Sequence, residues 1–120
     1  MASQAHVLVV EDNELVSDAL RVLFETVGYR VSVAASVAEA LGIAAGDPPA
    51  LTLLDLTLPD GDGLALVEPL RVAGCKTVVA LTGHDEPEVR EKCLASGCTE
   101  VLVKPVPARE LVRRIGLWLT

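Results

Sequence analysis

Aromatic residues, histidines and cysteine pairs are scarce in this chain, and each scarcity excludes a class of protein. Aromatics make up only 2% of the 120 residues, so a folded core has to be built from Val, Leu and Ala. Cys75, Cys93 and Cys98 form no CxxC pair, and the two histidines, His6 and His84, lie far apart. The pattern predicts neither a disulfide framework nor a zinc site, and we interpret the cysteines as reduced core residues.

Long apolar runs and an excess of positive charge are also absent. No apolar stretch approaches the roughly 20 residues that span a bilayer, and the amino terminus lacks a basic segment followed by an apolar one. The chain has 10 basic and 17 acidic residues and a net charge of -7, which disfavours nucleic acid and anionic membranes as partners. We therefore expect one soluble, cytoplasmic domain over residues 1–120.

Hydrophobic residues make up 51% of the chain, and much of this content lies in short runs. One run, residues 50–54, is bounded by chain breakers and has no helical spacing, which predicts a strand buried on both faces. The strand leads directly into Asp55, and Pro59, Gly61 and Gly63 then predict a loop. An acid at the carboxyl end of a buried strand lies at the edge of the sheet where open α/β folds have their binding and catalytic sites.

The same alternation of strand and helix is found along the rest of the chain. Further strands are predicted at residues 6–10, 30–34, 77–81 and 100–103, and helices between 13 and 28, 36 and 46, 63 and 72, 85 and 96, and 107 and 119. Asn13 and Ser36 are predicted N-caps, and Glu39 completes a capping box with Ser36. Pro69 lies inside the third helix, where it is expected to cause a kink or remove one hydrogen bond.

Strict alternation of strands and helices predicts a parallel sheet with helices on both faces. Five units are too few for an eight-stranded barrel. The predicted fold class is α/β, a doubly wound five-stranded parallel sheet with flavodoxin-like (βα)5 topology and strand order 2-1-3-4-5. In that order, strands 1 and 3 lie side by side at the topological switch point.

Polar side chains follow four of the five predicted strands. Glu11 and Asp12 follow the first strand, Asp55 the third, Thr82 the fourth and Lys104 the fifth, whereas the second strand ends in alanines. The carboxyl ends of parallel strands meet at one edge of the sheet. We therefore expect three carboxylates, one hydroxyl and one ammonium group to converge on one crevice.

Three carboxylates a few ångströms apart repel one another and raise the pKa of at least one of them unless a cation lies among them. Ligands that are all hard oxygens suit Mg²⁺, and Glu11 and Asp12 form a pair suited to the metal. Lys104 can contact an anion, and Thr82 offers a hydroxyl group to a ligand oxygen. A carboxylate can attack phosphorus to form an aspartyl phosphate. Asp55, which stands alone on its strand, is the predicted nucleophile.

At these positions the sequence resembles the receiver (phosphoacceptor) domain of two-component response regulators. The matching motifs are Glu11-Asp12, Asp55-Leu-Thr-Leu-Pro59 running on to Asp62-Gly63, Thr82-Gly83, Gly97 and Lys104-Pro105, with Gly28-Tyr29 before the second strand. Each motif is short, but their joint order and spacing are specific. The resemblance covers residues 6–119.

The resemblance implies a role for each of these positions. Asp55 would be the phosphoacceptor, and the carboxylates of Glu11, Asp12 and Asp55 would surround Mg²⁺ together with the backbone carbonyl of Thr57. Thr82 and Lys104 would contact the phosphoryl oxygens, and the Lys104–Pro105 peptide bond would be cis.

The resemblance also implies partners for the domain. The phosphoryl donor would be a phosphohistidine on a sensor histidine kinase or a histidine phosphotransfer protein. The domain would act as a self-phosphorylating and self-dephosphorylating acceptor rather than a turnover enzyme. A homodimer and contact with an effector domain are both left open.

Three positions depart from the family pattern. Val101 stands where the family usually has an aromatic residue that reorients on activation, Val106 stands where a Phe commonly follows the Lys-Pro pair, and Pro69 is unusual in the third helix. The first two departures bear on the threonine–aromatic switch and leave the phosphorylation chemistry untouched.

Two other functions fit the same fold. A pseudo-receiver is an interaction module without phosphorylation, but it usually lacks the acceptor or the acids, and this chain has both. A Mg²⁺-dependent phosphatase with an aspartyl nucleophile usually has a second acid two residues after the first, where this chain has Thr57.

Overall fold

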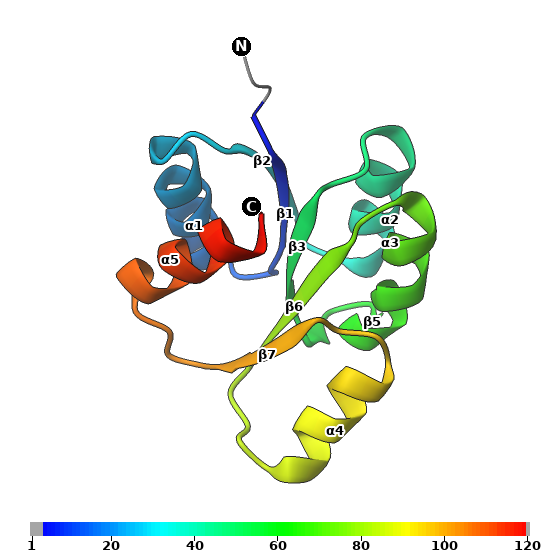
Figure 1. Cartoon of the computed structure of the whole chain (residues 1–120). Helices are drawn as coiled ribbons and strands as arrows, with labels where there is room; N and C mark the ends of the chain where they lie inside the picture. Colours follow the sequence, from blue (N-terminus) through cyan, green and yellow to red (C-terminus); the bar gives the residue numbers. More distant parts are fainter. Residues whose placement is uncertain (1–3, 120) are drawn as a thin grey trace.

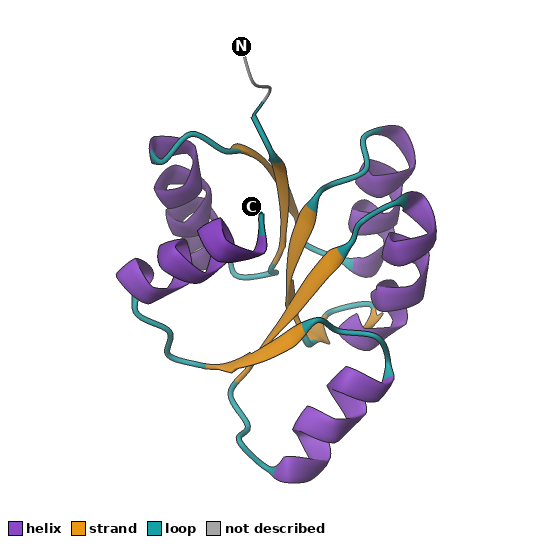
Figure 2. Ribbon diagram, in the orientation of Figure 1, coloured by secondary structure: helices purple, strands orange, loops and turns teal. Residues whose placement is uncertain are grey.

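The computed structural model describes residues 4–119, apart from the side chain of Thr57. A five-stranded parallel sheet lies between two layers of helices (Figures 1 and 2). Its strands are β1 (His6–Val10), β2 (Arg30–Ala34), β3 (Leu51–Asp55), β6 (Thr77–Thr82) and β7 (Glu100–Val103), in the order β2-β1-β3-β6-β7. Counting only the strands of this sheet, this is the predicted order 2-1-3-4-5, which is therefore confirmed.

The helices cover both faces of the sheet, as the alternation predicted. Figure 1 shows α1 (Glu14–Thr26) and α5 (Ala108–Trp118) on one face, and α2 (Val37–Gly46), α3 (Val67–Ala73) and α4 (Pro87–Ala95) on the other. Over residues 4–119, none of the helices combines the length and apolar character needed to cross a bilayer.

Side chains of the central strands pack into two separate hydrophobic cores, one on each face of the sheet. In β1, Leu8 and Val10 belong to the core beneath α2 and α3, whereas Val7 and Val9 belong to the core that also contains Phe24 of α1. Alternate residues of a strand point to opposite faces, so a strand covered on both sides has to be apolar throughout. This requirement explains why the strands are continuous apolar runs.

Side chains cap the first two helices as the sequence indicated. The Asn13 carboxamide oxygen accepts hydrogen bonds from the backbone N–H groups of Leu15 and Val16. The Ser36 hydroxyl accepts from the Glu39 N–H at 3.1 Å, and the Glu39 carboxylate in turn accepts from the Ala35 N–H at 2.9 Å. These bonds satisfy backbone donors that have no partner within the helix.

The segment after β3 is more ordered than the loop that the sequence predicted. It forms a small antiparallel hairpin, β4 (Thr57–Leu58) with β5 (Gly61–Asp62), and a 3₁₀ turn, η1 (Gly63–Leu66), which runs into α3. Pro69 therefore lies in the first turn of α3, where its missing N–H has no intrahelical partner to lose.

Gly63 packs directly against the end of the central strand. A Cβ atom at this position would lie 2.5 Å from the carbonyl oxygen of Asp55 and 3.0 Å from the Cα atom of Leu56. The Gly63 N–H also donates to the Leu56 carbonyl at 3.0 Å. The close approach fixes the hairpin against the backbone that carries Asp55.

Gly63→Ala should lower the free energy of unfolding by about 1–3 kcal/mol, because the added methyl group meets backbone atoms that cannot rotate away. Urea unfolding measures the change. Gly42→Ala is the matched control: it lies in α2 with nothing within 4 Å of the new Cβ, so helix propensity should make it neutral or stabilising. Equal stability of the two variants would contradict the close approach at Gly63.

Candidate functional site

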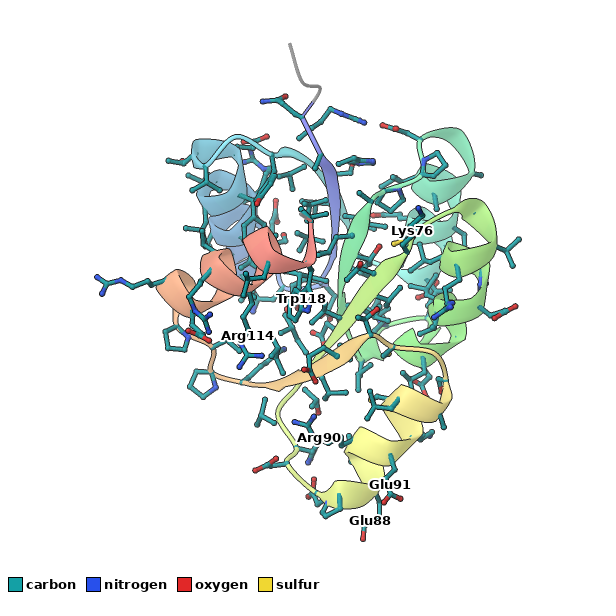
Figure 3. The ribbon with its side chains drawn as sticks, viewed as in Figure 1. Lys76, Glu88, Arg90, Glu91, Arg114 and Trp118 are labelled. Atoms are coloured by element: carbon teal, nitrogen blue, oxygen red, sulfur yellow. The ribbon has the colours of Figure 1, made fainter. Side chains whose placement is uncertain are left out.

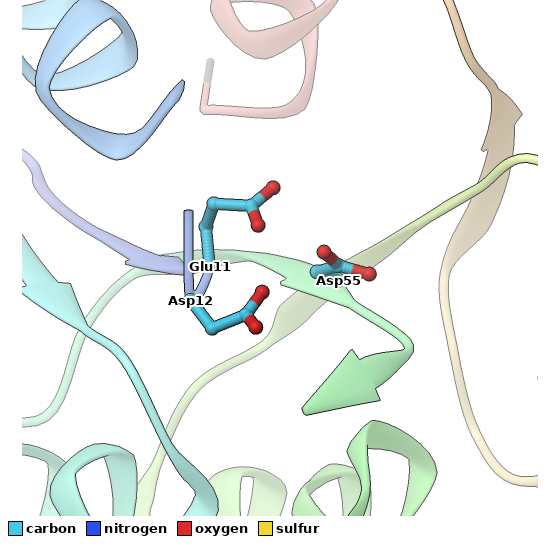
Figure 4. Close-up of side chains that lie close together, drawn as sticks. All are labelled: Glu11, Asp12 and Asp55. Atoms are coloured by element: carbon cyan, nitrogen blue, oxygen red, sulfur yellow. The ribbon is translucent and has the colours of Figure 1, made fainter. Parts of the chain in front are cut away.

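Three carboxylates meet at the carboxyl ends of β1 and β3 (Figure 4). Each of Glu11, Asp12 and Asp55 offers an oxygen that lies within 4.8 Å of an oxygen of the other two. The Glu11 and Asp55 residues are only 5% and 8% exposed, whereas Asp12 is exposed to solvent. The predicted cluster of acids is therefore present at the switch point between neighbouring strands.

Backbone hydrogen bonds hold these acids in place. The Glu11 N–H donates to the Ala34 carbonyl at 2.9 Å, which continues the β1–β2 pairing beyond the strand. The Glu11 carboxylate accepts a hydrogen bond from the Asn13 N–H at 3.1 Å. Asp55 is the last residue of β3 and pairs in register with Leu81 of β6. Asp55 and Thr82 thus belong to the strands themselves, one residue further than the sequence predicted.

Lys104 places a positive charge between two of the acids. Its Nζ atom lies 3.4 Å from Oδ2 of Asp55 and 3.8 Å from Oε1 of Glu11. The Lys104 backbone N–H donates to the Thr82 carbonyl at 2.7 Å, and the Lys104–Pro105 peptide bond is cis, as expected. One ammonium group therefore partly neutralises a cluster that carries up to three negative charges.

The surroundings of Glu11 favour the protonated form of its carboxyl group and raise its pKa. The pKa of Glu11 is raised to about 6, mainly by burial of the carboxyl group and also by the neighbouring Asp55 carboxyl, against the opposing effects of the Asn13 N–H and Lys104. The sequence predicted a raised pKa in one acid through repulsion between the carboxylates. The pKa of Glu11 is raised, but burial is the largest cause and the Asp55 carboxyl adds to it.

A solvent-accessible cleft of about 340 Å³ opens beside Asp55. The side chains and backbone that line it come from four loops and strand ends: Asp12, Asp55, Leu56, Leu81, Thr82, Gly83, His84 and Lys104. The buried Thr82 hydroxyl accepts a hydrogen bond from the His84 N–H at 3.1 Å. Sequence reasoning identified four of these residues and missed His84, although its position two residues beyond the end of a site strand was a usable signal.

Thr57 lies in β4, two residues beyond Asp55, and pairs with Asp62 across the hairpin. Its side chain lies outside the described part of the structure. The assignment of its backbone carbonyl to a metal stays a prediction.

The two positions that lack the family's aromatic residues are both filled by valine. Val101 is 3% exposed on β7 and packs in the core beneath α2, α3 and α4, and Val106 packs against the opposite core. Arg90 of α4 (Figure 3) donates to the Val101 carbonyl at 3.4 Å and pairs with the Glu100 carboxylate at 3.3 Å. A guanidinium group thus connects α4 to the edge strand.

Comparison with protein families identifies this arrangement. The model of the response regulator receiver domain matches residues 7–116. The chain belongs to this family. The receiver domain is 36% identical over 115 residues to the TorCAD operon transcriptional regulatory protein TorR of Escherichia coli K12, with 94% of this chain and 50% of TorR covered. The chain therefore spans about half the length of that relative.

Solved structures show the same fold. A two-component response regulator from Clostridium difficile superposes with a TM-score of 0.91 at 26% identity, covering 97% of this receiver domain and 96% of that chain. The receiver domain of the sensor histidine kinase PA1611 from Pseudomonas aeruginosa has a TM-score of 0.84 at 30% identity, with 98% of both chains covered. That structure has a magnesium ion coordinated in its active-site cleft.

The acids of this receiver domain fit a Mg²⁺ ion by their chemistry and spacing. All of the side-chain ligands are carboxylate oxygens, which Mg²⁺ prefers. Their separation of up to 4.8 Å is close to the roughly 4 Å between opposite oxygens around Mg²⁺. The exposure of Asp12 leaves room for the water molecules that Mg²⁺ usually retains.

The stability of the magnesium-free protein should fall as pH rises from about 4.5 to about 6.5, because the folded state holds the Glu11 proton more tightly than the unfolded state does. A pKa shift from 4.5 to about 6 corresponds to a loss of about 2 kcal/mol. Urea unfolding across this pH range measures the fall, which Glu11→Gln should remove. The exposed Glu91→Gln serves as a control and should retain it, and an unchanged fall in Glu11→Gln would exclude Glu11 as its source.

Proposed function

We propose that this receiver domain accepts a phosphoryl group on Asp55 in a Mg²⁺-dependent reaction and acts as a conformational switch in two-component signal transduction. The observation that carries the proposal is the position of the Asp55 carboxylate. It contacts an ammonium group, lies beside two further acids, and lines a cleft that is open to solvent. A carboxylate that attacks phosphorus needs three features: access for the phosphoryl donor, a nearby cation site, and a positively charged group that contacts the transferred phosphoryl oxygens.

The proposed reaction transfers the phosphoryl group from a phosphohistidine. An Asp55 carboxylate oxygen forms a bond to phosphorus, the bond between phosphorus and the donor imidazole nitrogen breaks, and the imidazole leaves with the electron pair. Glu11, Asp12 and Asp55 would hold Mg²⁺, which when bound supplies positive charge between carboxylates and phosphoryl oxygens. Lys104 can move from its contact with Asp55 to a phosphoryl oxygen, and the Thr82 hydroxyl can donate to another.

A shallow apolar groove next to the cleft supports a protein as the donor. The groove lies between α1 and the segment after β7 and is lined by Glu11, Val16, Leu20, Leu81, Lys104, Pro105, Val106 and Leu111. Two of these residues, Glu11 and Lys104, also belong to the acid cluster and its counter-charge. We propose that a sensor histidine kinase or a histidine phosphotransfer protein docks here, so that its phosphohistidine reaches Asp55.

The switch is proposed to act through α4 rather than through an aromatic side chain. Val101 is small, β-branched and already packed in the core, so its side chain has little freedom to reorient. Movement of Thr82 toward a phosphoryl group would instead pull on the loop that begins α4, where Gly83 permits unusual dihedral angles. Arg90 links that helix to β7. Movement of α4 can therefore reach the edge of the sheet, where a second copy or an effector domain would read it.

The comparison with other functions favours phosphoryl acceptance. All acids, the hydroxyl and the ammonium group of the site are present, which is unexpected for a pseudo-receiver. The position two residues beyond Asp55 is not acidic, which disfavours a phosphatase that turns over external substrates. We infer an acceptor domain rather than a turnover enzyme. We also propose a cytoplasmic location, supported by three buried, unpaired cysteines.

Incubation with acetyl phosphate and Mg²⁺ should add one phosphoryl group, detected as an increase in intact mass. Asp55→Asn should abolish the adduct, because an amide cannot provide the carboxylate nucleophile. The exposed Asp85→Asn, on the loop above the cleft, should retain it and serves as the control. An adduct of equal yield in Asp55→Asn would show that the acceptor lies elsewhere.

A further inference from the structure

One titratable side chain at the cleft has no role in phosphoryl acceptance. His84 lies on the loop between β6 and α4 and lines the cleft together with Asp55, Thr82 and Lys104. Its backbone N–H donates to the Thr82 hydroxyl at 3.1 Å, which ties this part of the loop to the site. Its side chain is 74% exposed, so water can reach the imidazole.

A carboxylate lies next to this imidazole. Nδ1 of His84 is 3.6 Å from Oε1 of Glu86, a distance typical of an ion pair. A carboxylate beside Nδ1 favours the tautomer with the proton on that nitrogen, which leaves a lone pair on Nε2. An imidazole whose other nitrogen faces a carboxylate is the usual arrangement of a general base.

The other polar side chains of the cleft are poorly suited to accept a proton from water. Lys104 and Thr82 provide positive charge and a hydroxyl donor, and Asp12 would be committed to the cation. Asp55 would itself carry the phosphoryl group. Among the described residues that line the cleft, His84 is the one with an imidazole, whose ring nitrogen can accept a proton and is not assigned to the cation or the phosphoryl group.

We propose that His84 is the general base that hydrolyses the aspartyl phosphate, with Glu86 as a positioning residue, an inference that rests on the proposed phosphorylation of Asp55. The imidazole takes a proton from a water molecule as the water oxygen attacks phosphorus. The bond between phosphorus and the Asp55 oxygen breaks, which releases inorganic phosphate and restores the carboxylate. The proton then passes from the imidazole to solvent. His84 thereby sets the lifetime of the phosphorylated state.

The experiment follows the decay of protein that already carries the phosphoryl group. Wild type and variants are loaded with acetyl phosphate and Mg²⁺, the donor is removed by rapid desalting, and the phosphorylated fraction is followed by intact mass. His84→Gln keeps a polar side chain of similar length but removes the base. We expect it to slow the decay roughly 10- to 100-fold, because a positioned general base contributes a factor of about 100 or more. Glu86→Gln should slow it by a smaller factor, and Asp85→Asn should match wild type.

Chemical rescue separates a base from a structural role. Added imidazole should restore rapid decay in His84→Ala and change wild type little, and ³¹P NMR should show inorganic phosphate as the product. Decay of His84→Gln at the wild-type rate, or no rescue of His84→Ala, would overturn the role of His84. Failure of wild type to accept a phosphoryl group at all would instead overturn the proposed function, so the two failures are distinguishable.

Discussion

The structure depends on one unfavourable interaction, the repulsion among three carboxylates gathered at the ends of two neighbouring strands. Lys104 contacts two of these acids, yet the pKa of Glu11 remains raised to about 6. Burial of the Glu11 carboxyl group and its proximity to Asp55 therefore outweigh the effect of the single ammonium group. We propose that a divalent cation would stabilise this cluster and would allow an anionic phosphoryl group to approach an anionic nucleophile.

The surrounding fold keeps the three carboxylates close together. The parallel order of the strands brings Glu11, Asp55, Thr82 and Lys104 to one edge of the sheet. Gly63 holds the following hairpin against the Asp55 backbone. In the proposed function, the donor would dock in the apolar groove beside Lys104, the loop carrying His84 would promote hydrolysis, and the Arg90 link to β7 would carry the output.

Much of this arrangement could be predicted because its signals are local. Apolar runs that end in Asp55 or Lys104 indicate buried strands and their functional ends, and Ser36 with Glu39 indicates a helix start. The β4–β5 hairpin could not be predicted, because its strands of two residues are too short for any periodicity to appear. His84 was missed although it follows Thr82 by two residues, because the hydrogen bond from its N–H to the Thr82 hydroxyl, which ties the loop to the site, became visible only in the structure.

The most direct test of the account is the binding of beryllofluoride, a phosphoryl analogue, measured by ¹⁹F NMR with and without Mg²⁺. The carboxylate cluster should exclude the anionic analogue in the absence of the cation and bind it at Asp55 when millimolar Mg²⁺ is present. Asp12→Ala should weaken this binding, because it removes one oxygen ligand of the cation. Equal binding with and without Mg²⁺ would contradict the claim that the negative charge gathered at Glu11, Asp12 and Asp55 governs binding at the site.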